Sequence, residues 1–372
     1  SKYLKKSTKE TPANSLTTTP QPPSFAHRLT VKTILLSLSL SPMACCSAKS
    51  LLFLFLISAI PIAYLISLEI ARPSTHVYHY HSSGWFRECA KWDDLNRRFL
   101  VSFLEGGVGQ LSVPEELDRK SPETVILQEV PVVKDVDLAG NGSFGLVIDQ
   151  PRNRFLVAIA DAIGNRYGAV AAYDLSTWNR LFLTHLSGPS DGKSFSEDVA
   201  VDAEGNAYVA DAKGNKIWKV GVDGKLLSII TSPLFSPKEW HRNLVGLNGI
   251  VYHPDGFLIV VHTFSGNLYK IDITKGSEEV KLIKVVGGSL IFGDGLELLS
   301  PTKLVVAKNP SGRLVESSDG WETASVVAKL LGPTHRVATA ATVKDGKVYL
   351  SYLLGMGYPK KKHAIAEAVF SA

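Results

Sequence analysis

Cysteine is scarce in this chain of 372 residues. It has three cysteines, and Cys89 alone lies beyond the apolar stretch near the N-terminus, since Cys45 and Cys46 precede that stretch. The body of the chain therefore holds no pair of cysteines, which excludes the class of small secreted domains that disulfides stabilise. A hydrophobic core must hold the fold instead, and a hydrophobic content of 45% is enough for one.

An excess of one charge is also missing from the body of the chain. Residues 1–42 hold six of the 40 basic residues and one of the 35 acidic residues, so residues 43–372 hold 34 of each. The formal net charge of +5 therefore belongs to the leader. A protein that binds nucleic acid presents a basic surface, so the sequence predicts no nucleic-acid partner.

Long hydrophobic runs are missing except near the N-terminus. Leu51–Leu68 is apolar over a length close to the roughly 20 residues of a membrane-spanning helix, and Pro61 interrupts it. One positive charge, Lys49, precedes the run, as in a secretory signal peptide or a signal anchor. Both interpretations stay open. Either one predicts the secretory pathway (ER lumen, vacuole or extracellular space), with membrane anchorage if the helix is retained.

The leader allows two interpretations as well. The first methionine is Met43, so residues 1–42 are either sequence from upstream of the native start or an organelle transit peptide, since they are rich in serine and poor in acids. We predict a disordered leader at 1–42, a signal peptide or signal anchor at 43–71, a linker at 72–87 and a folded body at 88–372.

The body reads as short strands separated by turns. One unit has four strands of about five residues, with glycine in each turn between them: Glu197–Asp202, Asn206–Asp211, Lys216–Gly221 and Leu226–Thr231. Such a pattern predicts an antiparallel meander. No long segment has the 3.6-residue period of an amphipathic helix.

The same unit recurs along the body. The starts of the first strands align at these positions, here called ring positions: Glu88, Phe144, Glu197, Asn248, Asp294 and Arg336. Their spacing shortens from 56 to 42 residues, close to the roughly 40–50 residues of a propeller blade. We predict an all-β fold, a six-bladed β-propeller, in which Ala364–Phe370 adds a strand that closes the ring.

The ring positions predict a metal site. The first strands of a propeller line its central channel, so equivalent starts converge at one mouth. Four ring positions offer oxygen ligands: Glu88, Glu197, Asn248 and Asp294. Three carboxylates at one point repel one another unless a cation or proton intervenes, and calcium takes six to eight oxygen ligands. We therefore predict calcium as the cofactor.

The motifs around these residues resemble the SMP-30/gluconolactonase/luciferin-regenerating-enzyme family over about residues 84–355. Glu88 stands in Glu-Cys-Ala-Lys-Trp-Asp, Asn248 in Asn-Gly-Ile-Val-Tyr-His-Pro-Asp-Gly and Asp294 in Asp-Gly-Leu. The resemblance implies a six-bladed propeller with calcium at the channel mouth, held by Glu88, Asn248 and Asp294. Glu197 stands where the family usually has asparagine, which keeps an oxygen ligand but adds a charge.

The resemblance implies hydrolysis of a small lactone, ester or phosphotriester. Calcium would polarise the reacting oxygen of such a substrate. A carboxylate would act as base or nucleophile, with Asp294 as the first candidate and Glu197 as the second. His335, Arg336 and Phe144 are predicted to contact the substrate. Arg336 has two equal interpretations: it binds an acidic substrate or developing oxyanion, or it pairs with a ring carboxylate.

Two other functions stay open at this stage. A propeller can serve as a non-catalytic interaction protein, in which calcium is structural or absent. It can also be a condensing enzyme similar to strictosidine synthase, and the oxygen donors at the ring positions argue against that. Gly188–Gly192 matches the G-x-S-x-G pattern, but a strand follows it rather than the helix that a nucleophile elbow requires.

Overall fold

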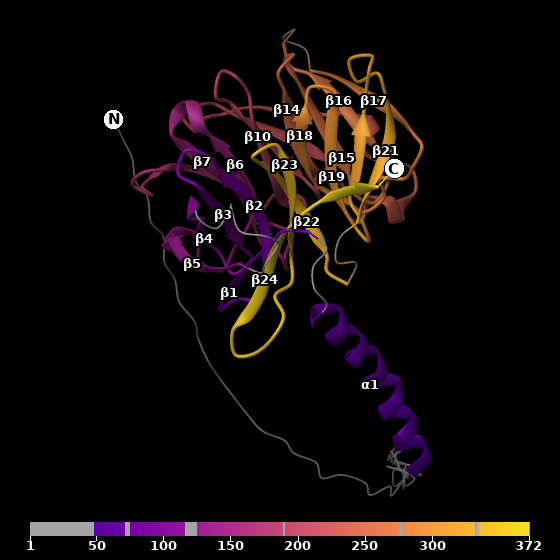
Figure 1. Cartoon of the computed structure of the whole chain (residues 1–372). Coiled ribbons are helices and arrows are strands. Elements are labelled where there is room, and N and C mark those ends of the chain that lie inside the picture. The colour runs from indigo at the N-terminus through magenta and orange to yellow at the C-terminus, as the bar shows by residue number, and fades with distance from the viewer. Residues whose placement is uncertain are drawn as a thin grey trace, which may run out of the picture. The chain divides into compact units, whose positions relative to one another are not determined.

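The computed structural model of the chain describes residues 48–70, 75–115, 125–188, 190–274, 278–331, 333 and 335–371 (Figure 1). The predicted leader at 1–42, with Met43, Cys45 and Cys46 after it, lies outside the described residues. The described chain divides into two units, and the boundary falls within the N-terminal helix, between Ile60 and Pro61.

Helix α1 spans Ala48–Ile70 and confirms the prediction of an apolar N-terminal helix. Its segment Leu52–Ile70 has 19 residues and a mean hydropathy of 2.2, so its length and composition suit a membrane crossing. A signal sequence has the same properties. The choice between an anchor and a cleaved signal therefore stays a prediction.

The rest of the described chain is mostly β-strand, as predicted. Runs of four consecutive strands form antiparallel meanders. Their bounds are β2 Arg87–Asp93, β3 Arg98–Phe103, β4 Val108–Ser112 and β5 Val125–Val133; β6 Gly142–Asp149, β7 Arg154–Ala160, β8 Gly168–Asp174 and β9 Arg180–Ser187; β10 Ser196–Val201, β11 Ala207–Asp211, β12 Lys216–Val220 and β13 Leu226–Thr231; β14 Leu247–His253, β15 Phe257–His262, β16 Leu268–Asp272 and β17 Glu279–Val286; β18 Gly293–Ser300, β19 Lys303–Lys308, β20 Arg313–Glu316 and β21 Thr323–Leu331.

A further meander combines both ends of the body. Strands β22 (Ala338–Lys344), β23 (Lys347–Tyr352) and β24 (Lys361–Glu367) are followed at the sheet edge by β1 (Val77–Ser82), which pairs antiparallel with β24. Strand β1 also pairs in parallel with β5. The ring therefore closes between an N-terminal and a C-terminal strand.

This closure corrects two predictions. Residues 77–82, assigned to the linker at 72–87, form β1, in which Tyr78 and Tyr80 are buried and His81 is exposed. The alternation of tyrosine and histidine is thus the pattern of a half-buried strand. The predicted closing strand at Ala364–Phe370 is confirmed in part, because 364–367 belong to β24, which pairs with β1. Its last residues belong to β25 (Val369–Ser371), which pairs with β21 instead of closing the ring.

The meanders surround one axis. The first strands contact each other in cyclic order, from β2 through β6, β10, β14, β18 and β22 back to β2. Apolar layers fill the space between neighbouring sheets: Leu156 and Val170 of one sheet pack with Val209 and Trp218 of the next. This packing places the start of every first strand near the axis, which is where the predicted site lies.

Candidate metal centre

A β-bulge interrupts each first strand at the same point. The register shifts fall between Arg87 and Ala90, Ser143 and Leu146, Ser196 and Asp198, Leu247 and Ile250, Gly293 and Leu296, and Ala338 and Ala340. A bulge redirects the side chain of the extra residue and ends the regular pairing. The bulges therefore mark equivalent positions near the axis.

In the last meander this position is Thr339, not Arg336. Thr339 lines the cavity at the axis, and its hydroxyl donates a hydrogen bond to the backbone oxygen of Glu88. Arg336 precedes β22 and lies in its connection to β21. The predicted register was wrong here because the spacing of repeats shortens along the chain and the local sequence carries no mark of the bulge.

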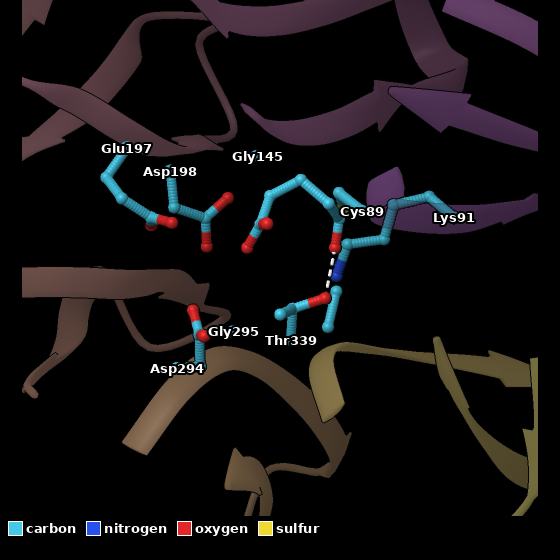
Figure 2. A pocket seen from close by; sticks show the side chains of 10 residues that line it. Cys89, Lys91, Gly145, Glu197, Asp198, Asp294, Gly295 and Thr339 are labelled. Atoms are coloured by element: carbon cyan, nitrogen blue, oxygen red, sulfur yellow. Dashed lines mark hydrogen bonds between the residues drawn. The ribbon is translucent and has the colours of Figure 1, made fainter. Parts of the chain in front are cut away.

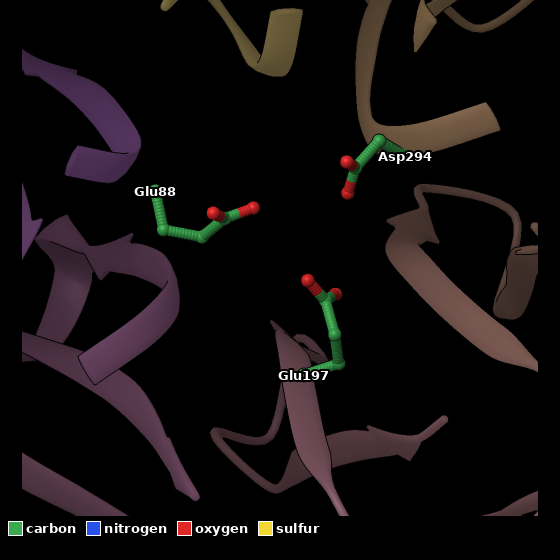
Figure 3. A group of neighbouring side chains, drawn as sticks. All are labelled: Glu88, Glu197 and Asp294. Atoms are coloured by element: carbon green, nitrogen blue, oxygen red, sulfur yellow. The ribbon is translucent and has the colours of Figure 1, made fainter. Parts of the chain in front are cut away.

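Glu88, Glu197 and Asp294 come together. Each offers one carboxylate oxygen, and these oxygens all lie within 4.8 Å of one another. Figure 3 shows the three side chains pointing to a common centre from separate strands. The cavity among them is small, about 10 Å³, which is room for one water molecule or one ion (Figure 2).

Burial and mutual repulsion raise the pKa of all three carboxyl groups. Burial raises the pKa of Glu88 to about 7, and the neighbouring Asp198 adds to this effect. The pKa of Glu197 rises well above its ordinary value through burial and then Asp294, and that of Asp294 rises through burial and then Glu88. Three negative charges are therefore unstable together at neutral pH, and a cation at their centre would remove the repulsion.

Asn248 adds an amide to the same centre. Its side chain is 5% exposed and donates a hydrogen bond to Asp294. Its carbonyl oxygen Oδ1 is buried and has no hydrogen-bond partner. A buried acceptor without a partner costs about 1–3 kcal/mol, so this oxygen needs a ligand. The set of carboxylate and amide oxygens fits calcium, which is a hard cation.

The sequence prediction missed Asp198. Its carboxylate lines the cavity, where burial raises its pKa to about 6, while Oδ1 accepts from the backbone N–H of Val199 (2.9 Å) and Oδ2 from that of Ile250 (3.1 Å). Regular strand alternation would send Glu197 and Asp198 to opposite faces. The bulge brings both to the axis, and two consecutive acids in a first strand were the available signal.

Gly145 makes room for Asp198. A Cβ at this glycine would lie 2.1 Å from Asp198 Oδ1 and 2.5 Å from Asp198 Cα. We expect Gly145→Ala to lower the free energy of unfolding by about 1–3 kcal/mol and to displace Asp198. Thermal unfolding checks this, with Gly192→Ala as the control because a Cβ there would meet no atom within 4 Å. A wild-type melting temperature for Gly145→Ala would contradict the expectation.

A lysine lies deeper along the axis, and the sequence prediction also missed it. Lys91, three residues after Glu88, lies 2.5 Å from Glu297 Oε2 and donates to the backbone oxygen of Ala341 at 2.9 Å. Glu297 is three residues after Asp294, so the pair forms the next layer inward. The attraction of Glu297 outweighs burial and raises the pKa of Lys91, which keeps a positive charge beneath the carboxylates.

The other predicted site residues do not line the cavity between the carboxylates. Phe144 occupies its ring position but offers no ligand; it is buried and packs edge-to-face on Phe195, with ring centroids 4.6 Å apart. His335 Nε2 and Arg336 Nε both lie 2.6 Å from Glu69 Oε1. Arg336 thus pairs with a carboxylate, but that carboxylate is on α1 and not at a ring position.

The raised pKa of Glu88 predicts how pH changes stability. Its pKa lies above the ordinary 4.5, so protonation stabilises the fold fully below about pH 4.5, and this contribution is lost as pH rises through about 7. We expect the melting temperature in chelator to fall between about pH 5 and pH 8. Saturating calcium should remove that fall. Calorimetric unfolding across this range tests it, and a melting temperature in chelator that stays flat or rises contradicts it.

Comparisons with known proteins show the fold and leave the activity open. No protein-family model matches the chain, and no curated protein matches its sequence. The major allergen Mala s 1 of Malassezia sympodialis has a similar structure, with a TM-score of 0.60 and 16% identity over 78% of this chain and 96% of that chain. This likeness shows a fold of the β-propeller type.

Two further solved structures have lower scores. A protein of unknown function from Bacteroides caccae has a TM-score of 0.47 and 12% identity over 67% of this chain and 82% of that chain. A catalytically inactive virginiamycin B lyase from Staphylococcus aureus has a TM-score of 0.46 and 10% identity over 79% of this chain and 100% of that chain.

Proposed function

We propose that the chain is a six-bladed β-propeller that binds calcium at the mouth of its central channel and hydrolyses a small lactone, ester or phosphotriester there. One observation carries the proposal: one carboxylate oxygen each of Glu88, Glu197 and Asp294 lie within 4.8 Å of one another. The motifs that resemble the SMP-30/gluconolactonase/luciferin-regenerating-enzyme family support the choice of reaction.

The donor set favours calcium over softer metals. Glu88, Asn248 and Asp294 would hold the ion, and Glu197 would add a further oxygen. Sulfur and imidazole ligands select zinc, copper or iron, whereas oxygen ligands alone suit calcium, magnesium or manganese. Cys89, next to Glu88, is buried, and burial raises the pKa of its thiol, so it stays protonated. Irregular oxygen sets suit calcium better than magnesium, which demands an octahedron.

The chain's own residues would then position the substrate and move a proton. Calcium, when bound, supplies a Lewis acid for the carbonyl or phosphoryl oxygen. Asp294 or Glu197 would accept the proton of the attacking water, because a carboxylate within reach of that water can act as a general base. Phe144 and Phe195 offer an apolar wall for the carbon part of a substrate.

Calcium titration of the full chain in detergent tests the metal site first. We expect binding in the wild type by isothermal calorimetry and binding weakened by about 100-fold or more in Glu88→Gln and Asp294→Asn. A screen of lactones, aryl esters and phosphotriesters then tests the reaction, with both variants as inactive controls. Calcium binding without turnover of any substrate would favour the non-catalytic interaction protein. Absence of calcium binding in the wild type would overturn the proposal.

A further inference from the structure

One end of the propeller is defined by the direction of its strands. All first strands begin at the carboxylate cluster, so the connections that lead into them lie at the same end. Antiparallel pairing brings the turn between the second and third strands of each meander to this end too. We call the described residues of these connections the mouth face: 83–86, 104–107, 134–141, 161–167, 188, 190–195, 212–215, 232–246, 263–267, 287–292, 309–312, 333, 335–337 and 353–360.

The mouth face exposes large apolar side chains from many separate connections. The most exposed are Ile163 (94%), Tyr358 (88%), Val136 (85%) and Trp240 (76%). Half-exposed aromatic side chains such as Phe292 join them. Among the described turns at the opposite end, the large hydrophobic residues exposed in this way are Leu95 and Val222. The two ends of the fold therefore differ in the number of large apolar side chains that they expose.

The two ends also differ in charge. In the described connections of the mouth face, lysine and arginine outnumber aspartate and glutamate, as in Lys238 and Arg242. In the described turns at the opposite end, acids outnumber bases, with Asp94, Asp223 and Asp345 among them. Basic and aromatic groups also meet directly, since the Lys361 ammonium lies 4.8 Å from the ring centre of Trp85 at the mouth face.

The end of helix α1 is tied to the mouth face. Glu69, one residue before the helix ends, accepts from Arg336 Nε at 2.6 Å and from Arg336 Nη2 at 2.8 Å. His335 Nε2 lies 2.6 Å from the same carboxylate, and Lys362 Nζ lies 3.8 Å from it. The segment Leu52–Ile70 is long and apolar enough to cross a membrane. The C-terminal end of this segment therefore contacts the mouth face through Glu69.

We propose that the mouth face lies against a lipid bilayer, so that the carboxylate cluster opens toward the lipid headgroups. Tryptophan and tyrosine are enriched where proteins meet the membrane interface, which fits Trp85, Trp240 and Tyr358. Basic residues are attracted to anionic headgroups, which fits the charge of this face. The acidic opposite end would be repelled by the same surface and faces water.

A bilayer explains the pattern better than a protein partner. The apolar residues protrude singly from many connections around the axis, whereas a protein interface has one packed apolar core. The residue that pairs with the helix end, Arg336, belongs to this face and not to the opposite one. Contact with a bilayer requires neither calcium binding nor hydrolysis, because the exposed residues, the charge of the mouth face and the helix end support it by themselves.

Fluorescent reporters on the two faces of the full chain test the proposal. Cys45→Ser and Cys46→Ser remove the two N-terminal cysteines, and the remaining Cys89 is buried. In this background, Ile163→Cys or Tyr358→Cys carries one environment-sensitive fluorophore. As matched controls at the opposite end, Leu95→Cys or Val222→Cys carries the same fluorophore. The protein is reconstituted in vesicles of phosphatidylcholine with or without phosphatidylserine. We expect doxyl-labelled lipid to quench the Ile163 and Tyr358 reporters and aqueous iodide to quench the Leu95 and Val222 reporters.

Each outcome decides the proposal. The proposal is supported if doxyl-labelled lipid quenches the emission of the Ile163 and Tyr358 reporters. Phosphatidylserine should strengthen this quenching. Trp240→Glu should weaken it, and Leu95→Glu should not. Quenching of the mouth-face reporters by iodide alone, or equal lipid quenching on both faces, overturns it. Protein that does not associate with either kind of vesicle also overturns it. Calcium binding measured on the same samples keeps this result distinct from the fate of the proposed activity.

Discussion

Asp294→Asn should make the metal-free protein more stable and should abolish the stabilisation that the proposed calcium ion would give to the wild type. In the wild type, burial and the charge of Glu88 raise the pKa of Asp294, so its ionised form destabilises the fold at neutral pH. Asparagine keeps the size of the side chain and removes the charge. We expect the melting temperature of Asp294→Asn in chelator at about pH 8 to rise above that of the wild type, measured by calorimetric unfolding.

The same substitution should weaken calcium binding by about 100-fold or more, because loss of a buried charged partner costs about 3 kcal/mol. Asp255→Asn is the matched control: its side chain is 74% exposed in a turn at the opposite end, so neither stability nor calcium binding should change. If Asp294→Asn instead lowers the melting temperature in chelator, the ionised Asp294 does not destabilise the metal-free fold. The three carboxylates are then held together in some way other than by a cation.

Arg87→Ala should be the most destabilising single change at the closure of the ring. The Arg87 guanidinium is buried and forms a bidentate pair with Glu129, with Nε–Oε2 at 2.7 Å and Nη2–Oε1 at 2.9 Å. It also binds Glu105 at 2.8 Å and Ser82 of β1. The Glu129 side chain is 5% exposed, so alanine leaves a buried charge unpaired. We expect a loss of about 3–5 kcal/mol in the free energy of unfolding.

A double variant separates the ion pair from the packing. Arg87→Met with Glu129→Gln removes both charges and keeps most of the volume, so it should recover a large part of the loss seen in Arg87→Ala. Lys347→Ala serves as the control, because its pair with Glu367 is solvent-exposed at 58% of the lysine side chain and such pairs contribute about 1 kcal/mol or less. Equal unfolding free energies for Arg87→Ala and Lys347→Ala would contradict this account.

Local signals were enough to predict much of the fold and part of the site. The turns and the alternation within Glu197–Thr231 depend on neighbouring residues, so they predicted meanders that the structure confirms. Glu88, Glu197 and Asp294 stand at the same place in their repeats, and equivalent places meet at an axis in any closed ring of meanders. Their approach to within 4.8 Å therefore followed from the register of the repeat.

The bulges lay beyond local signals. A bulge depends on how one first strand packs against the next, as where Gly145 makes room for Asp198. For this reason the sequence prediction missed Asp198 and misplaced the last ring position by three residues, at Arg336 instead of Thr339. The alternation of side chains along an ideal strand predicts neither result, because a bulge shifts that alternation by one residue.

The sequence by itself determined the class of structure and the chemistry at the ring positions, since strand periodicity, turn residues and the repeated oxygen donors are all written within short segments. The tertiary structure alone decided the closure, where His79 of β1 meets His363 of β24 across 284 residues of chain. It also decided the partner of Arg336, which is Glu69 of helix α1. Such contacts join residues that no short segment contains, because they form only when the complete ring brings its two ends together.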